Sequence, residues 1–209
     1  MTVPNSKHRI NLKKQRIRLL FSNIEKSFVD IYKGRQHNFI QMRLPVETIT
    51  EDFEELLRNK IEHNNLGAII RKATKNDIEI LRNIHERAWR SFLQPFHPIS
   101  EKLFLRIFND PDTAFLIATV DSVDCGFVLL DLEGEKKEYG VIAGLGILPE
   151  FQRKGLGTVL GLAAWDYFKA KGAKELRCEV HRENNKSYSF IKWLGFEEID
   201  RSDITFPLK

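Results

Sequence analysis

The spacing of apolar residues predicts helices and strands along most of the chain. Between residues 16 and 32, apolar side chains recur three and four positions apart, which predicts one amphipathic helix. A second, shorter helix is predicted over residues 51–61, where acidic residues occupy the first turn. After Gly67 the pattern changes to short apolar runs separated by polar turns. We therefore expect a helical N-terminal extension over residues 1–67 and a folded domain over residues 68–209.

The domain after residue 67 is predicted to combine strands with helices. Its strands are indicated by short apolar runs bounded by turn residues, over 68–73, 114–120, 125–132, 139–147, 175–180, 196–199 and 204–208. Its helices are indicated by apolar residues at helical spacing, over 77–89, 100–108, 157–171 and 184–194. The three central strands are joined by short polar turns, so we expect antiparallel hairpins. This order predicts an α+β fold, with helices on a mixed sheet.

Composition supports a globular protein whose charge is unevenly distributed. The 209 residues are 42% apolar and 30% charged, which is enough to bury a sizeable core. The net charge is +4, but residues 1–44 alone carry ten Lys/Arg and two Asp/Glu, a net of +8. We interpret this basic segment in two ways. In the first, it is a helix that packs on the core or on the partner subunit of a homodimer. In the second, it is an arm that contacts RNA or the ribosome through phosphates.

Cysteine content and hydropathy bear on the compartment. Two cysteines, Cys125 and Cys178, fit a reducing compartment better than a disulfide framework, and neither has a Cys or His partner at zinc-ligand spacing. No metal site is therefore expected. No apolar run reaches the roughly 20 residues of a membrane span, and the first residues lack the apolar core of a secretion signal. We expect a cytoplasmic protein without a membrane segment.

The loop before the longest predicted helix has the features of a phosphate site. Gly155 and Gly157 precede this helix, and backbone N–H groups at a helix N-terminus attract anions. Arg153 and Lys154 add positive charge beside them. The chain has no Gly-Lys-Ser/Thr of a nucleotide-hydrolase loop, and Leu160 stands where a dinucleotide fingerprint needs its third glycine. A strand-to-helix turn without a ligand remains the simplest alternative.

Three segments together resemble the GNAT acyltransferase superfamily, whose members bind acetyl-CoA. The first is Gln-x-x-Gly-x-Gly at residues 152–157, behind a predicted strand that ends in Ile-x-Pro at residues 147–149. The second is Leu-Arg-Cys-Glu-Val-His-Arg-Glu-Asn at residues 176–184, and the third is the helix over 184–196 that ends in Leu-Gly-Phe. The first two segments look most like those of ribosomal-protein N-terminal acetyltransferases. The order of elements from residue 68 fits the same superfamily.

The resemblance implies a mixed, mostly antiparallel sheet whose central strands splay apart and hold acetyl-CoA, the acetyl donor, between them. The backbone of residues 145–147 would pair with the pantetheine amides, and the glycine loop would hold the pyrophosphate. Asn184 matches the position whose side chain meets the pantetheine arm. The residues that the resemblance assigns to acetyl-CoA are Leu145, Gly146, Ile147, Gln152, Arg153, Lys154, Gly155, Leu156, Gly157, Thr158 and Asn184.

The resemblance also suggests two candidate catalytic residues. Glu179 lies five residues before Asn184, where the N-terminal acetyltransferases carry their proton acceptor. A solvent-facing strand carboxylate is the alternative for Glu179. The family's proton-donating tyrosine would fall at Ile191, which has no proton to donate. Tyr188, about one helical turn earlier, is the candidate that could replace it, and water is the other.

We therefore expect an acetyl-CoA-dependent N-acetyltransferase whose acceptor is a primary amine of a protein or peptide. A small-molecule amine is the first alternative. The second alternative, motivated by Ile191, is a sensor that binds acyl-CoA without transferring the acyl group. In this fold the acceptor side is shaped by the segment over residues 89–99, where His97 could line the acceptor cleft or be an ordinary loop residue.

Overall fold

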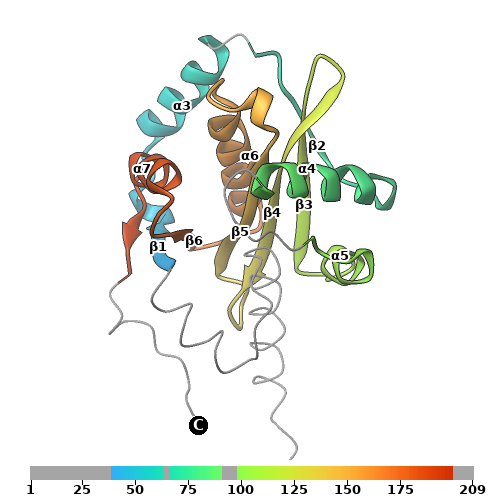
Figure 1. Ribbon diagram of the computed structural model, residues 1–209. Helices are drawn as coiled ribbons and strands as arrows, with labels where there is room; N and C mark the ends of the chain where they lie inside the picture. Colours follow the sequence, from blue (N-terminus) through green and yellow to red (C-terminus); the bar gives the residue numbers. More distant parts are fainter. Residues whose placement is uncertain (1–38, 64–65, 91–97, 200–209) are drawn as a thin grey trace, which may run out of the picture.

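A seven-stranded sheet forms the centre of the computed structural model, which describes residues 39–63, 66–90 and 98–199 (Figure 1). The strand order is β2-β3-β4-β5-β6-β1-β7. The strands are β1 (Phe39–Pro45), β2 (Ile69–Lys72), β3 (Thr113–Val120), β4 (Val123–Glu133), β5 (Tyr139–Ile147), β6 (Glu175–His181) and β7 (Glu197–Glu198). Only β5 and β6 pair in parallel, and the other neighbours are antiparallel. The mixed, mostly antiparallel sheet predicted from the sequence is confirmed.

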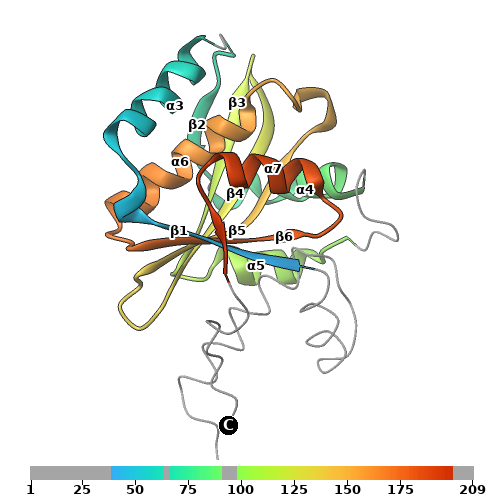
Figure 2. The ribbon, with the colours of Figure 1, turned by 90° about the vertical axis from the view of Figure 1, so that its left-hand side faces the viewer.

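Helices cover both faces of this sheet. The helices are α3 (Glu51–His63), α4 (Ile78–Arg90), α5 (Glu101–Phe108), α6 (Leu156–Ala170) and α7 (Asn185–Trp193). Three short 3-10 helices are η1 (Val46–Thr48), η2 (Lys75–Asp77) and η3 (Pro149–Phe151). The helices α4 and α5 contact one face, whereas α6 contacts β3, β4 and β5 from the other face (Figures 1 and 2). The helix α3 packs on α6, and α7 contacts β6.

The hydrophobic core lies on both faces of the sheet, because helices cover its middle strands on each side. Eight consecutive residues of β4, from Cys125 to Leu132, are buried. A strand that is covered on both faces reads as a continuous apolar run rather than an alternating one. On the α5 side, Phe104 and Phe115 stack with ring centroids 5.3 Å apart, and Phe127 lies 6.0 Å from Phe115. The aromatic residues therefore join α5 to the centre of the sheet.

Most of the predicted elements are confirmed, and one strand was missed. The strand β1 lies in the segment that was expected to be a helical extension, yet it pairs with β6 along seven residue pairs. Its sequence alternates Ile40, Met42 and Leu44 with polar residues, a signal that was present but short. Residues 39–63 therefore contribute a strand and a helix to the same sheet and its packing. The predicted helix over 16–32 and strand over 204–208 lie outside the described residues.

Candidate active site

The site begins where two parallel strands separate. The strands β5 and β6 pair from Tyr139 opposite Glu175 to Ile142 opposite Cys178, and the pairing ends there although both strands continue. A cavity of about 460 Å³ occupies the gap and is lined by residues 141–147 of β5 and by 178–181 of β6. The splayed central strands that the resemblance implied are therefore present.

A β-bulge accompanies this separation. In the pairing of β5 with β4, Leu129 stands opposite Gly144 and Leu130 opposite Ile142, so Ala143 is an extra residue. Side chains alternate between the two faces of a strand, so one extra residue moves each following side chain to the opposite face from the one it would otherwise occupy. Accordingly, a Cβ placed on Gly140 would lie 2.6 Å from Phe168 of α6, whereas one placed on Gly146 would lie 2.7 Å from Trp89 of α4. The bulge therefore turns the β5 backbone at the cavity, a feature that the sequence pattern does not reveal.

The glycine loop connects the end of β5 to α6. The Gln152 Nε2 group donates a hydrogen bond of 3.0 Å to the carbonyl oxygen of Ile147, which ties the loop to the strand. Gly155 is the N-cap of α6 and has a φ of +84°, a left-handed conformation that glycine adopts without a steric penalty. No acidic residue lies in the first turn of α6, so no carboxylate competes with an anion there. The loop and helix start can hold a pyrophosphate.

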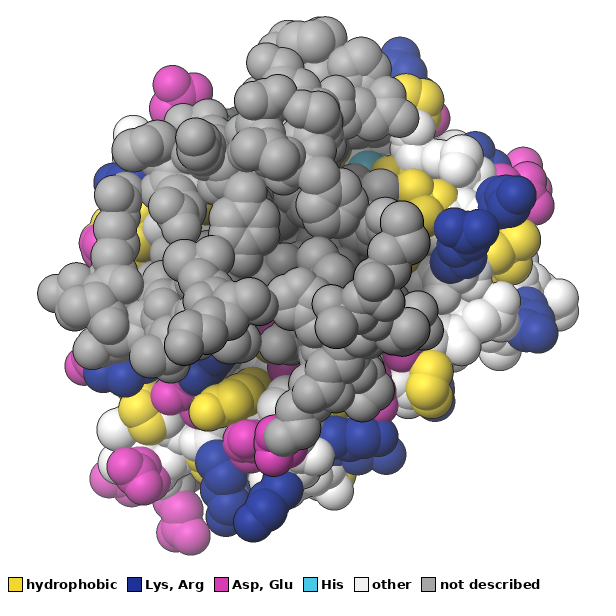
Figure 3. All heavy atoms as spheres, turned by 90° about the horizontal axis from the view of Figure 1, so that it is seen from below, with side chains coloured by type: hydrophobic (Ala, Val, Ile, Leu, Met, Phe, Trp, Pro, Cys, Tyr) yellow, Lys and Arg dark blue, Asp and Glu magenta, His cyan; other side chains and the backbone are white. Residues whose placement is uncertain are grey.

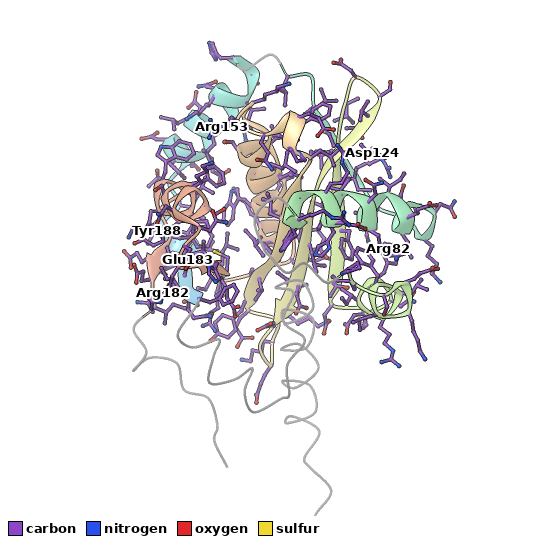
Figure 4. The ribbon with its side chains drawn as sticks, in the orientation of Figure 1. Arg82, Asp124, Arg153, Arg182, Glu183 and Tyr188 are labelled. Carbon is purple, nitrogen blue, oxygen red and sulfur yellow. The ribbon has the colours of Figure 1, made fainter. Side chains whose placement is uncertain are left out.

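The loop residues assigned to acetyl-CoA divide into two groups. Leu145, Gly146, Ile147, Gln152 and Asn184 line the cavity itself. The remaining ones form the loop and the first turn of α6 at the edge of the cavity, namely Arg153, Lys154, Gly155, Leu156, Gly157 and Thr158. Figure 4 labels Arg153 in the loop that leads into α6. The two groups are continuous in the chain, because Gln152 lines the cavity and Arg153 follows it directly.

Two half-buried polar residues of β6, Glu179 and His181, lie on the wall of the cavity. Leu176, Cys178 and Val180 are buried, whereas Glu179 and His181 alternate with them and are half-buried. Both Glu179 and His181 line the cavity. His181 was not singled out in the sequence, because it lies one residue beyond the strand predicted over 175–180; in β6 its spacing of two from Glu179 places both side chains on one face. Its ring meets Phe39 of β1 edge to face, with centroids 5.1 Å apart.

The helix α7 begins at the cavity but does not bring Tyr188 into it. The Asn184 Oδ1 atom accepts a hydrogen bond of 3.1 Å from the Ser187 N–H and so caps α7. Ile191 lines the cavity. Tyr188, the candidate to replace the family tyrosine, is not among the lining residues, and its hydroxyl donates to Glu198 at 2.7 Å. This hydrogen bond raises the pKa of Tyr188.

Tyr188 therefore lies on the side of α7 that faces β7. In Figure 4 it is drawn beside α7, near Arg182 and Glu183 of the preceding turn. The geometry offers no support for Tyr188 as the proton donor, because its hydroxyl is engaged outside the cavity. The expected segment of the acceptor side is described only in part: Trp89 lines the cavity, whereas residues 91–97, including His97, lie outside the described residues.

Two further properties concern the described part of the chain. Within residues 39–63, 66–90 and 98–199, no helix combines the length and hydropathy needed to cross a membrane. In the same ranges, no three His, Cys, Asp or Glu side chains are grouped so that they could hold a metal ion. The charged or titratable residues that line the cavity there are Cys178, Glu179, His181 and Lys186.

Comparisons with known proteins agree with this geometry. The sequence model of the Acetyltransferase (GNAT) family matches residues 81–196. An uncharacterized N-acetyltransferase of Methanocaldococcus jannaschii is 28% identical over 164 residues, which cover 73% of this chain and 72% of that protein. The spermidine N(1)-acetyltransferase of Thermoplasma acidophilum is 31% identical over 158 residues, which cover 67% of this chain and 96% of that protein.

Solved structures give the same result. AAC(6')-Iy in complex with the bisubstrate analogue CoA-S-monomethyl-acetylneamine has a TM-score of 0.55 at 26% identity, covering 68% of this chain and 97% of that one. The ribosomal-protein-S18-alanine N-acetyltransferase from Escherichia coli has a TM-score of 0.55 at 23% identity, covering 63% and 79%, and shares the fold. The fold and the splayed site define an acyltransferase that binds acetyl-CoA. The chain belongs to the Acetyltransferase (GNAT) family and is an N-acetyltransferase with acetyl-CoA as its donor.

Proposed function

We propose that this N-acetyltransferase acts on a primary amine of a protein or peptide, and that Glu179 accepts the proton of that amine. The observation that carries the proposal is the position of Glu179 on the cavity wall, across the gap from the β5 backbone. In the proposed complex, the pantetheine arm lies along residues 145–147 and beside Asn184. The pyrophosphate lies at residues 153–158. This arrangement directs the thioester toward the bulge at Ala143, opposite β6.

The chemistry then requires few protein groups. The amine nitrogen forms a bond to the thioester carbonyl carbon, the C–S bond breaks, and the amine proton passes to the Glu179 carboxylate directly or through a water. The coenzyme A thiolate takes its proton from solvent, because Ile191 has no proton to give and the Tyr188 hydroxyl is bonded to Glu198. An α-amine has a pKa of about 7.7–8.0, against about 10.4 for lysine. A carboxylate is therefore better suited to an α-amine acceptor.

The charges at the cavity favour an acceptor with a single amine. In the described part of the chain, Glu179 is the one carboxylate among the lining residues, and His181 and Lys186 are basic. Residues 91–97, with the sequence Ser-Phe-Leu-Gln-Pro-Phe-His, contain no acid either. A polyamine or an aminoglycoside carries several positive charges, and recognition of such a ligand favours several carboxylates. A peptide N-terminus carries one amine and needs fewer carboxylates for its recognition.

A small-molecule amine is the second candidate, and the relatives favour it. The Thermoplasma acidophilum protein, whose length this chain covers almost completely, is named as a spermidine acetyltransferase. AAC(6')-Iy was solved with an analogue that joins coenzyme A to an acetylated neamine. Both names concern amines that are not peptides. The two candidates therefore differ in a way that an acceptor panel can resolve.

The setting of the enzyme is part of the same proposal. We place it in the cytoplasm, with residues 1–44 contacting either a second copy of the chain or the RNA phosphates of a ribosome. The net charge of +8 in that segment supports a contact with phosphates. The strand β1 takes up the end of this segment, so the contact would involve the residues before it.

The test measures release of coenzyme A from acetyl-CoA with three acceptor panels: peptides with free N-termini, N-blocked lysine peptides, and small polyamines with aminoglycosides. We expect turnover with the first panel. The Glu179→Gln variant should lower kcat by about 100-fold, the range of general base catalysis, while the Kd for acetyl-CoA changes less than twofold. Glu183→Gln removes the same charge from the turn after β6, outside the cavity lining, and should match the wild type.

Three outcomes would contradict parts of this proposal. Turnover confined to polyamines or aminoglycosides would replace the peptide acceptor with the second candidate. An unchanged kcat in Glu179→Gln would remove Glu179 from the mechanism. Tight binding of acetyl-CoA without turnover above hydrolysis in any panel would favour the sensor that binds but does not transfer.

A further inference from the structure

We propose that Gln41, on the N-terminal strand β1, is a positioning residue that holds the Glu179 carboxylate ionised and directed into the cavity. The inference rests on the proposed role of Glu179 and extends the site to a part of the chain that precedes the family match at residues 81–196. The observation behind it is the register of β1 on β6, which places Gln41 opposite Glu179 and Phe39 opposite His181.

The register determines which side chains are neighbours. Residues directly opposite in an antiparallel pair lie on the same face, with Cβ atoms about 4.5–5.5 Å apart. On β1, Met42 and Leu44 are buried in the core, so the alternate residue Gln41 faces the other side together with Glu179. On that side, Gln41 is partly accessible, as Glu179 is. The glutamine is therefore a cross-strand neighbour of the carboxylate.

The next pair along the same register is in direct side-chain contact. Phe39 and His181 are opposite one another, and their rings meet edge to face with centroids 5.1 Å apart. Phe39 also lines the cavity, beside Glu179 and His181. The strand β1 thus reaches the cavity at its first residue. Gln41 lies two residues further along the same face.

The chemistry of a glutamine suits this position. Its amide NH₂ group supplies two hydrogen-bond donors, and a donor to a carboxylate favours the ionised form and lowers its pKa. An ionised carboxylate is the form that accepts a proton. The amide adds no charge of its own, so it orients the carboxylate without forming an ion pair that would have to be broken when the proton arrives.

The other charged groups near Glu179 make a substitution easy to interpret. In the described residues these groups include the basic or imidazole side chains of Arg177 and His181 on β6, Arg43 on β1 and Lys186 on α7. Two acids lie further along the same face: Glu175 of β6, which is paired with Arg177, and Glu197 of β7, which stands opposite Arg43. The facing wall, residues 141–147 of β5, carries no charged side chain, and the lining residues of α4 and α6 are Ala88, Trp89 and Gly161. A carboxylate introduced at position 41 would stand directly opposite Glu179, closer in the register than Glu175 or Glu197.

The experiment compares the pH dependence of kcat/KM for the acceptor amine in the full-length wild type and three variants. Gln41→Glu places a like charge beside Glu179 and should move the acidic limb of the profile upward by about one pH unit. Gln41→Met keeps the length of the side chain but removes the donors, so it should move the limb in the same direction by less and lower kcat. Asn59→Asp adds the same charge on the exposed side of α3 and should leave the profile unchanged.

The outcomes separate this inference from the proposed function. The melting temperature and the Kd for acetyl-CoA are measured for every variant. If Gln41→Glu does not fold, the pH profile of Gln41→Met alone tests the positioning role. Profiles of both Gln41 variants that coincide with that of the wild type would overturn the positioning role, even where Glu179→Gln is inactive. An acidic limb that persists unchanged in Glu179→Gln would instead show that another group titrates, and the proposed role of Glu179 would fail first.

Discussion

At the scale of single residues, the site depends on the backbone as much as on side chains. Gly155 caps α6 at a φ of +84°, and Gly146 lies so close to Trp89 that a Cβ would come within 2.7 Å of the indole. Neither position tolerates a larger residue without a shift of the backbone or of the tryptophan. Among the described residues that line the cavity, Glu179 is the one carboxylate available for chemistry.

The first prediction concerns Gly155. Because its φ lies in the left-handed region, Gly155→Ala should cost about 1 kcal/mol of stability and displace the first N–H groups of α6. We expect the KM for acetyl-CoA to rise about tenfold, measured by steady-state coenzyme A release, with a smaller change in kcat. The displaced groups are those that would face the pyrophosphate.

The matched control is at the other end of the same helix. Gly172 has a φ of +74° and nothing within 4 Å of a Cβ placed on it, so Gly172→Ala introduces a similar strain away from the cavity. It should lower the melting temperature to a similar extent while the KM for acetyl-CoA stays at the wild-type value. Equal KM values in the two variants would argue against a phosphate role for the loop at Gly155.

At the scale of elements, the sequence predicted the helices and strands that have a strong hydrophobic periodicity or contain a motif. The strand β5 was predicted with its observed bounds, and α6 was predicted within one residue at each end, because apolar runs and two glycines mark them. The strand β1 was missed, since three alternating apolar residues beside a basic segment are a weak signal until β6 supplies the pairing. The bulge at Ala143 was missed because it follows from register between strands.

The same reasons explain which residues of the candidate site could be predicted from the sequence. Glu179 and the loop residues could be proposed as site residues because they lie in motifs of fixed spacing, and the splay between β5 and β6 was implied by the resemblance. Gln41 and Phe39 could not be assigned, since their roles depend on which strand pairs with β6. The placement of Tyr188 could not be decided from helical spacing either, because its partner Glu198 lies on a different element.

The second prediction concerns a polar network that joins β2, η2 and β4. The Arg71 guanidinium donates to both oxygens of Asp77, at 2.9 and 2.8 Å, and to Asp124 at 2.7 Å. The backbone N–H and the hydroxyl of Thr74 also donate to Asp77, which is 7% exposed. These hydrogen bonds, of which the one from Arg71 has the largest effect, hold the pKa of Asp77 well below its usual range. The network therefore fixes the start of α4.

Asp77→Asn should lower the free energy of unfolding by about 2 kcal/mol at pH 7, as expected for hydrogen bonds to a charged group. A carboxylate whose pKa is depressed on folding stabilises the protein above its unfolded pKa of about 3.9, and this contribution is lost as the pH falls below that value. The difference between wild type and variant, measured by urea unfolding, should therefore narrow between pH 5 and pH 2. Asp52→Asn, on the exposed first turn of α3, is the control. A difference that is constant over this range would contradict the role of the charge.

At the scale of the whole molecule, the site is assembled from segments that are far apart in the chain. The cavity is lined by residues of β1, α4, β5, α6, β6 and α7 and of the segments next to them, which together span residues 39–196. Charge is distributed differently, since the excess of basic residues lies in residues 1–44 and the remaining 165 residues carry a net charge of −4. On the face shown in Figure 3, the coloured Lys/Arg and Asp/Glu side chains stand side by side. The part of that face left visible by the grey residues is therefore not uniformly basic.

This assembly leads to the third prediction, which concerns ligand-linked stability. Acetyl-CoA would contact both β5 and β6 at the place where the sheet is not held by hydrogen bonds between them, so its binding should stabilise the molecule as a unit. A ligand at 100 times its Kd stabilises by about 2.7 kcal/mol. For a chain of this size, that should raise the melting temperature by about 5–10 °C in thermal unfolding. ATP at the same concentration offers phosphates without a pantetheine arm and should give a shift of less than half. Equal shifts with the two ligands would mean that binding is confined to the phosphate loop, and no shift with millimolar acetyl-CoA would contradict the cavity between β5 and β6 as the donor site.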